Sequence, residues 1–207
     1  MAIVVVGGHA RNIGKTSVVA GLIRTLPEFR WSAFKVTYHW HGTDLVGAKE
    51  ESPFAISEEC PGAAGTDSSR YLEAAALRSF WVRTREGRLG EAMPRLREEF
   101  ARAQAGGGNV LVESNSILGF VEPEVYLSVL DPGITDFKES ALYYLDRADA
   151  VLLAAVIGSA SWKGVSLELL AGKPRFQMRP PKYVTAEIAG FVRERLEHVE
   201  ARREGGD

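Results

Sequence analysis

The sequence contains a single cysteine among its 207 residues, and this scarcity excludes two kinds of site. Cys60 has no partner for an intramolecular disulfide, and a zinc site built from several cysteines is excluded. A chain without disulfides is typical of a reducing compartment, so we predict a cytoplasmic protein. Long apolar runs are also missing. No stretch approaches the ~20 residues that span a bilayer, and the N-terminus lacks the basic segment and cleavage site of a signal peptide.

An excess of positive charge is the next absence. Lysine and arginine number 25 against 27 aspartates and glutamates, which gives a net charge of -2. We therefore expect neither a nucleic acid nor a membrane as a partner. The chain is 45% hydrophobic and 25% charged, as is typical of a globular protein, and its length suits one domain spanning residues 1–207.

Short apolar runs punctuate the chain, and most are continuous rather than alternating, as in parallel strands that are covered on both faces. The runs are Ala2–Val6, Ser32–Thr37, Ser79–Val82, Val110–Glu113, Val125–Leu130, Ala150–Ile157 and, more weakly, Arg175–Met178. Helical patterns lie between them. This alternation predicts an α/β fold with a mostly parallel sheet of about seven strands and helices on both faces.

Four segments have helical patterns. They are the segment from Lys15 to Leu26, the segment Leu89–Ala105, a helix from Asp136 to about Ala148 that a capping box of Asp136 and Glu139 would start, and a last helix capped by Thr185. Two regions lack periodicity. Residues 39–69 read as a long functional loop, and residues 200–207 as a frayed tail.

A glycine-rich loop follows the first apolar run, where a parallel sheet places its ligand site. The stretch "GGHARNIGKTS" resembles a phosphate-binding loop that opens a helix, so its backbone N–H groups would hold phosphate oxygens. Lys15 would reach the β- and γ-phosphates, and the Thr16 hydroxyl would bind Mg²⁺. The predicted nucleotide-binding residues are Gly8, His9, Ala10, Arg11, Asn12, Ile13, Gly14, Lys15, Thr16 and Ser17.

The loop departs from the common pattern G-x-x-x-x-G-K-[ST], because His9 stands where that pattern has its first glycine. Counted from Gly8, the loop has one residue more, and it still wraps a phosphate if Gly8 makes the turn. The alternative is a strand-to-helix turn with an incidental Gly-Lys-Thr. Arg11 would either stabilise charge on the γ-phosphate or point to solvent.

Two acidic residues are candidates for the metal site. Glu113 ends the apolar run "NVLVE" and reads as the acid of a Walker-B-like strand, or else as an exposed strand-end carboxylate. Asp67, in "GTDSSRY", is a second acid, the N-cap of a following helix, or both. Because Mg²⁺ prefers one or two carboxylates plus phosphate oxygens and water, the predicted metal ligands are Thr16, Glu113 and Asp67.

Further polar residues follow the second apolar run. Lys35 would contact a substrate anion or the γ-phosphate, or it is a solvated lysine at a strand end. His39 and His41 face one side of an extended chain, so they would begin a metal site or line a substrate or nucleotide pocket, or else have a surface or structural role. The sequence fixes no further ligand for such a metal site.

The loop G-x-x-x-x-x-G-K-T is similar to that of dethiobiotin synthetase, within the P-loop class that includes the MinD/ParA ATPases. The MinD-type signature lysine is missing, since Ala10 stands in its place. The chain more closely resembles molybdopterin-guanine dinucleotide biosynthesis protein B (MobB). The match lies in Lys35 with the histidines of "VTYHWHG", in "TDSSRYLEAAA" with Asp67 and Arg70, and in "VLVES".

The resemblance to MobB implies a GTP-binding protein with weak NTPase activity, a homodimer, and an accessory role with a protein partner in molybdenum cofactor biosynthesis. We expect Lys15, Asp67 and Glu113 in the catalytic role, and Lys35, His39, His41 and Arg70 at the substrate. One alternative is an ATP-dependent ligase or kinase like dethiobiotin synthetase. The other is a binding module with a vestigial loop. The residues alone leave ATP and GTP open, because no N-K-x-D motif is present.

Overall fold

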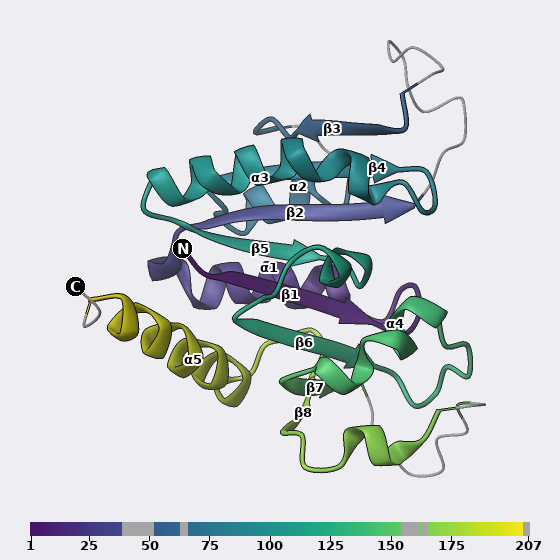
Figure 1. Cartoon of the computed structure of the whole chain (residues 1–207). Coiled ribbons are helices and arrows are strands. Elements are labelled where there is room, and N and C mark those ends of the chain that lie inside the picture. The colour runs from purple at the N-terminus through teal and green to yellow at the C-terminus, as the bar shows by residue number, and fades with distance from the viewer. Residues whose placement is uncertain (39–51, 63–65, 155–161, 163–164, 205–207) are drawn as a thin grey trace.

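The computed structural model describes residues 1–38, 52–62, 66–154, 162 and 165–204, and it confirms the predicted α/β fold class. Eight strands form one sheet in the order β3-β4-β2-β5-β1-β6-β7-β8, with every neighbouring pair parallel except β3 and β4 (Figure 1). The strands are β1 (Ile3–Gly8), β2 (Trp31–Tyr38), β3 (Phe54–Glu58), β4 (Arg78–Thr84), β5 (Asn109–Glu113), β6 (Val125–Leu130), β7 (Ala150–Leu153) and β8 (Arg175–Gln177).

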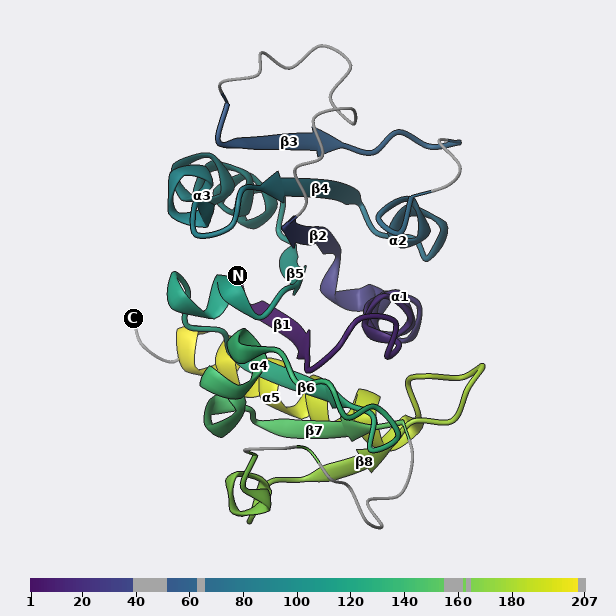
Figure 2. The same cartoon turned by 90° about the vertical axis from the view of Figure 1, so that its right-hand side faces the viewer.

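Helices cover both faces of the sheet, as predicted. The α-helices are α1 (Lys15–Thr25), α2 (Ser69–Glu73), α3 (Leu89–Ala105), α4 (Glu139–Tyr143) and α5 (Ala186–Glu204), and the 3-10 helices are η1 (Pro27–Phe29), η2 (Ser116–Gly119), η3 (Leu145–Arg147) and η4 (Leu167–Leu170). Figure 2 shows α1 and α2 on one side of the sheet and α3 on the other. One core cluster joins α1 and α5 to the sheet, and a second joins α3 to the opposite face.

The seven predicted strands are all present, but the sheet has an eighth that the sequence pattern did not reveal. β3 lies within residues 39–69, which we had expected to be a long loop. It pairs antiparallel with β4 at the edge of the sheet, and its residues are only half-buried or exposed. An edge strand covered on one side needs no continuous apolar run, which is why the pattern missed it.

Two helix predictions need correction or refinement. The helix expected from Asp136 to Ala148 is in fact the five-residue α4 followed by η3, and Lys138 at its N-cap makes no side-chain cap. The predicted capping box is therefore wrong. In contrast, the Thr185 hydroxyl does accept a bond from the Ile188 N–H at 3.5 Å, at the start of α5. That helix continues through Glu204, into the segment predicted as a tail.

The parallel arrangement brings the carboxyl ends of β1, β2 and β5 to one edge of the sheet. In the strand register, Glu113 on β5 lies beside Lys35 on β2 and beside Val6 on β1. The loop from β1 to α1 leaves from the same edge. Among the described residues, no helix is both long and apolar enough to cross a membrane.

The opposite end of β1 depends on one buried amide. Asn109 Oδ1 accepts the Ala2 N–H at 2.6 Å, and its Nδ2 donates to the Phe29 carbonyl at 2.9 Å. Asn109→Ala leaves both backbone groups without a partner, so we expect the free energy of unfolding to fall by about 2–3 kcal/mol. Urea denaturation measures the loss. The exposed Gln104→Ala on α3 is the control, with a change within about 0.5 kcal/mol. An equally small loss of unfolding free energy in Asn109→Ala would contradict the role given to these two hydrogen bonds.

Candidate functional site

The loop that connects β1 and α1 has the backbone form of an anion cradle. Gly14, just before α1, has φ 96°, a left-handed conformation that favours glycine, and its carbonyl accepts the Val18 N–H at 2.9 Å. At the other end of the loop, a Cβ on Gly8 would lie 2.9 Å from the Val129 carbonyl oxygen. Both glycines are therefore required by the path of the loop.

The predicted nucleotide-binding residues fall into two groups. Seven line a cavity at the edge of the sheet: Gly8, Arg11, Asn12, Gly14, Lys15, Thr16 and Ser17. The side chains of His9, Ala10 and Ile13 are instead buried in the protein, with at most 3% exposed. A cradle role for these three residues would rest on their backbone alone.

His9 ties the loop to the segment after β6. The Asp131 N–H donates to His9 Nε2 at 2.9 Å, so the ring proton lies on Nδ1, which donates to the Asp136 carbonyl at 2.8 Å. The His9 carbonyl in turn accepts the Lys138 N–H at 2.8 Å. Burial lowers the pKa of His9 and favours the neutral ring that these two bonds require. His9, the residue that departs from the common motif, therefore fixes the phosphate loop to the segment after β6. We call His9 with these hydrogen bonds the clamp.

Lys15 folds back onto its own loop. Its ammonium donates to the Ala10 carbonyl at 2.5 Å, inside the turn that a phosphate would occupy. Burial lowers the pKa of Lys15 to about 8, and the cations of Lys138, Lys35 and Arg11 act in the same direction. The ammonium of Lys15 is therefore incompletely solvated, and an anion bound at this place would stabilise its positive charge.

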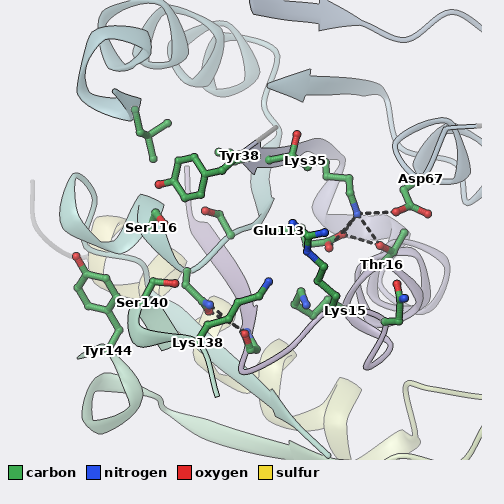
Figure 3. Close-up of a pocket in the computed structure, with 18 of the residues that line it drawn as sticks. Lys15, Thr16, Lys35, Tyr38, Asp67, Glu113, Ser116, Lys138, Ser140 and Tyr144 are labelled. Carbon is green, nitrogen blue, oxygen red and sulfur yellow. Dashed lines mark hydrogen bonds and ion pairs between the residues drawn. The ribbon is translucent and has the colours of Figure 1, made fainter. Parts of the chain in front are cut away.

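Three side chains converge on Lys35 at the centre of the site (Figure 3). The Lys35 ammonium donates to Thr16 Oγ1 at 2.9 Å and to Glu113 Oε1 and Oε2 at 3.0 and 3.1 Å, and it pairs with Asp67 Oδ2 at 2.9 Å. The Thr16 hydroxyl and the Tyr71 hydroxyl both donate to Glu113 Oε2. Glu113, with 6% of its surface exposed, thus has its charge compensated by Lys35.

These oxygen donors fit a magnesium ion. Thr16, Glu113 and Asp67 supply one hydroxyl and two carboxylates around a single point, and hard oxygen ligands of this kind are those Mg²⁺ prefers. That point is held by the ammonium of Lys35. In the described part of the chain no group of three or more His, Cys, Asp or Glu could hold a metal, so a site here would need oxygens from a bound phosphate.

The alternatives left open for Asp67 are now separable. The hydroxyl of Thr66, and not the carboxylate of Asp67, accepts the Ser69 N–H at 3.0 Å at the start of α2. The N-cap interpretation of Asp67 is therefore wrong, while its carboxylate lies at the predicted site beside Lys35. Arg70, one turn along, donates to Ser17 Oγ at 3.2 Å and lines the same cavity.

Two predicted residues cannot be compared with the structure, and two residues of the site were not predicted. His39 and His41 lie outside the described residues, so their predicted roles stay predictions. Conversely, Asn115 and Tyr71 belong to the site but were not predicted. Asn115 Oδ1 accepts the Gly8 N–H at 2.8 Å and its Nδ2 donates to the Gly8 carbonyl at 3.0 Å. The polar run "ESNS" after the strand was a usable signal for Asn115, whereas nothing in "SRYLE" marked Tyr71.

The cavity extends beyond the phosphate loop. Its volume is about 1140 Å³, and it extends from Lys15, Thr16 and Lys35 to a second wall formed by residues of β2, η2 and α4. Figure 3 shows this wall across the hollow from Thr16, Asp67 and Glu113. Tyr38, Ser116, Ser140 and Tyr144 are labelled on it, and Lys138 lies between the two sides in this view.

Comparison with known proteins gives a fold and no family. No family model matches the chain, and no curated protein matches it significantly. Among solved structures it is similar to HypB from Helicobacter pylori in complex with nickel, at 15% identity and a TM-score of 0.53, over 94% of this chain and 87% of that one. At this identity, the likeness shows the fold alone.

Two further structures match less well. The LpxK structure from Aquifex aeolicus in complex with ATP has 19% identity and a TM-score of 0.47, over 86% of this chain and 54% of that one. The signal recognition particle 54 kDa protein from Aeropyrum pernix K1, in complex with GDP, has 14% identity and a TM-score of 0.48, over 99% and 50%. The chain thus spans about half the length of each of these two proteins.

The buried, neutral His9 makes stability depend on pH. The unfolded chain takes up a proton near pH 6.5, but the folded pKa lies lower, so stability is full above pH 6.5 and is lost as the pH falls toward the folded pKa. The loss within this window approaches about 1.4 kcal/mol per pH unit. Urea denaturation from pH 7.5 to 5 should therefore show a steeper acid slope for wild type than for His9→Gln. Equal slopes would contradict the neutral clamp.

Proposed function

We propose that the chain binds a magnesium–nucleoside triphosphate at the carboxyl ends of β1, β2 and β5, and slowly hydrolyses or transfers its γ-phosphoryl group. The observation that carries this proposal is the convergence of Lys15 and Thr16, at the start of α1, with Glu113 and Asp67 on one wall of the cavity. Oxygen ligands for a cation and backbone N–H groups for an anion lie side by side, as a metal-bound phosphate chain requires.

Each residue has a separate proposed role. Lys15 would exchange the Ala10 carbonyl for phosphate oxygens, because a charged acceptor makes the stronger hydrogen bond. Thr16 and Glu113 would hold the metal, which when bound would neutralise charge on the β- and γ-phosphates. Asp67 would order the metal or the attacking water. Tyr71, whose pKa burial raises well above the usual value, stays protonated and keeps donating to Glu113.

Lys35 occupies the metal position and would have to leave it. Its ammonium bonds Thr16 and both oxygens of Glu113, so a magnesium ion and this ammonium compete for the same oxygens. Once displaced, Lys35 would lie near the γ-phosphate, where its charge would assist phosphoryl transfer. We infer that nucleotide binding without the metal leaves Lys35 in place, whereas binding with the metal moves it.

For the identity of the nucleotide and the pathway, we propose GTP and a MobB-like accessory role in molybdenum cofactor biosynthesis, with a homodimer and a protein partner. The support is the motif resemblance described above, carried by the nine-residue loop from Gly8 to Thr16, Lys35 and the run "TDSSRY". The low turnover that this role implies fits a site whose metal ligands are held by a lysine.

A second candidate is an ATP-dependent ligase or kinase like dethiobiotin synthetase. The specific observation that favours it is the extension of the cavity beyond the phosphate loop toward Tyr38 and Tyr144, which offers room for another ligand. Addition of the correct small substrate should then raise turnover sharply, which an accessory protein would not show.

Lys15→Ala tests nucleotide binding by thermal shift with Mg-GTP and Mg-ATP. Ligand at 100 times its dissociation constant should stabilise the wild type by ~2.7 kcal/mol. Lys15→Ala should lose this shift, because a cation in the phosphate cradle is removed, while the exposed Lys182→Ala should keep it. A shift with ATP alone would favour the second candidate. No shift with either nucleotide would contradict both and leave a vestigial loop.

Lys35→Met tests the competition with the metal. We expect the Mg²⁺ concentration that half-saturates binding of a fluorescent nucleotide analogue to fall, on the order of tenfold, or about 1.4 kcal/mol, because the competing ammonium is gone. Without Mg²⁺, the variant should bind the analogue more weakly than wild type, since one cation is lost. Lys182→Met is the matched control. An unchanged Mg²⁺ requirement in Lys35→Met would show that Lys35 does not occupy the metal position.

A further inference from the structure

The half of the cavity that lies away from Lys35, Asp67 and Glu113 has its own chemistry. We call it the aromatic subsite and define it by Tyr38, Ser116, Lys138, Ser140 and Tyr144. Tyr38 ends β2, Ser116 begins η2, and the other three lie at or around α4, so separate elements contribute to one wall. Figure 3 shows these side chains gathered around the hollow, apart from the group formed by Lys35, Asp67 and Glu113.

Lys138 is a cation of the cavity without a partner among the described residues. The ammonium of Lys15 has a carbonyl partner and that of Lys35 has two carboxylates, but the Lys138 side chain has no hydrogen bond or ion pair with any described residue. It is nevertheless half-buried, and burial together with the charges of Arg11 and Lys35 lowers its pKa. Asp136 and Glu113 act on it in the opposite direction, but neither forms an ion pair with it, and a partly desolvated cation without a direct ion pair favours binding of an anion.

The position of Lys138 is fixed by the backbone. Its N–H donates to the His9 carbonyl at 2.8 Å, and His9 is itself held by Asp131 and Asp136. The residue therefore stands at a set place beside the phosphate loop, at the N-cap of α4. An anion paired with Lys138 would lie next to the phosphates of a bound nucleotide.

Aromatic rings supply the remaining surface of the subsite. Tyr38 is half-buried at the end of β2, with Ser116 close to its hydroxyl. Tyr144 packs edge-on against Tyr143 at 4.8 Å between ring centroids. Tyr143 and Phe120, which also line the cavity, are 74% and 41% exposed, among the most exposed large hydrophobic side chains described. Exposed rings that line a cavity offer an apolar surface against which a ring-shaped ligand can pack.

We propose that the aromatic subsite binds a second ligand beside the nucleotide, a small organic anion with a flat ring. Its carboxylate or phosphate group would pair with Lys138, with the hydroxyls of Ser116 and Ser140 as further donors, and its ring would pack against Tyr38 and Tyr144. This proposal rests on the proposed nucleotide function and names the chemical class of the other ligand of that site.

Ligand-observed saturation-transfer NMR tests the proposal with benzoate and phenyl phosphate as probes. The protein is loaded with Mg²⁺ and a non-hydrolysable GTP analogue. We expect a saturation-transfer signal from both probes, at least about fivefold above that of benzamide, which lacks the charge, and of cyclohexanecarboxylate, which lacks the flat ring. The stronger of the two probe signals tells whether a carboxylate or a phosphate fits better.

Three variants make the test specific. Lys138→Met should lose the probe signals, because the charge is removed while the length of the side chain is retained. Tyr144→Leu should weaken them, and Lys182→Met should leave them unchanged. Melting temperatures of the variants within about 2 °C of wild type show that each has folded.

Two results would overturn the aromatic subsite. One is a probe signal as strong in Lys138→Met as in wild type, and the other is loss of the probe signal when the nucleotide analogue is added, which would place the probe in the phosphate loop. The signal of the nucleotide analogue itself is read in the same sample. If that signal is absent, the proposed function fails, and the dependence of the probes on Lys138 is then measured without nucleotide.

Discussion

The salt-bridged ammonium of Lys35 is the interaction on which the site depends. It joins β2 to β5 through Glu113, to the first residues of α1 through Thr16, and to the start of α2 through Asp67. Glu113 is buried, and a buried carboxylate without a counter-charge is strongly destabilising. The carboxylate that a metal would use is thus kept in place by a lysine, which makes the same group both a structural element and a competitor.

The phosphate loop is held from two sides by residues outside it. Asn115 exchanges two hydrogen bonds with the backbone of Gly8, and His9 exchanges three with the segment from Asp131 to Lys138. The extra residue therefore does not leave the loop loosely held, because His9 forms hydrogen bonds with a neighbouring segment. The same bonds place Lys138 at the cavity, so the clamp connects the phosphate half of the cavity to the aromatic half.

Much of the fold could be predicted from the sequence because the chain's strongest signals are local. Seven strands were predicted from their apolar runs, and α3 lies at the predicted residues. β3 was missed because an edge strand lacks such a run, and the capping box at Asp136 was wrong because the His9 ring donates to the Asp136 carbonyl and Lys138 takes the N-cap position. Tertiary contacts decided both cases.

The candidate site divides in the same way. Lys15, Thr16 and Glu113 stood in contiguous motifs and were predicted, with Asp67 as one of two interpretations. Tyr71 reaches Glu113 through the packing of α2, and Lys138 reaches the cavity through the loop before α4, so no spacing in the sequence indicated them.

The position of Lys35 in a crystal structure with Mg²⁺ and a non-hydrolysable GTP analogue tests the central claim most directly. We expect phosphate oxygens within about 3.2 Å of Lys15 Nζ and of the backbone N–H groups from Gly14 to Thr16, with Lys35 Nζ moved beyond that distance from Glu113. A nucleotide bound elsewhere, or a filled phosphate loop with Lys35 still bonded to Thr16 and Glu113, would contradict the account.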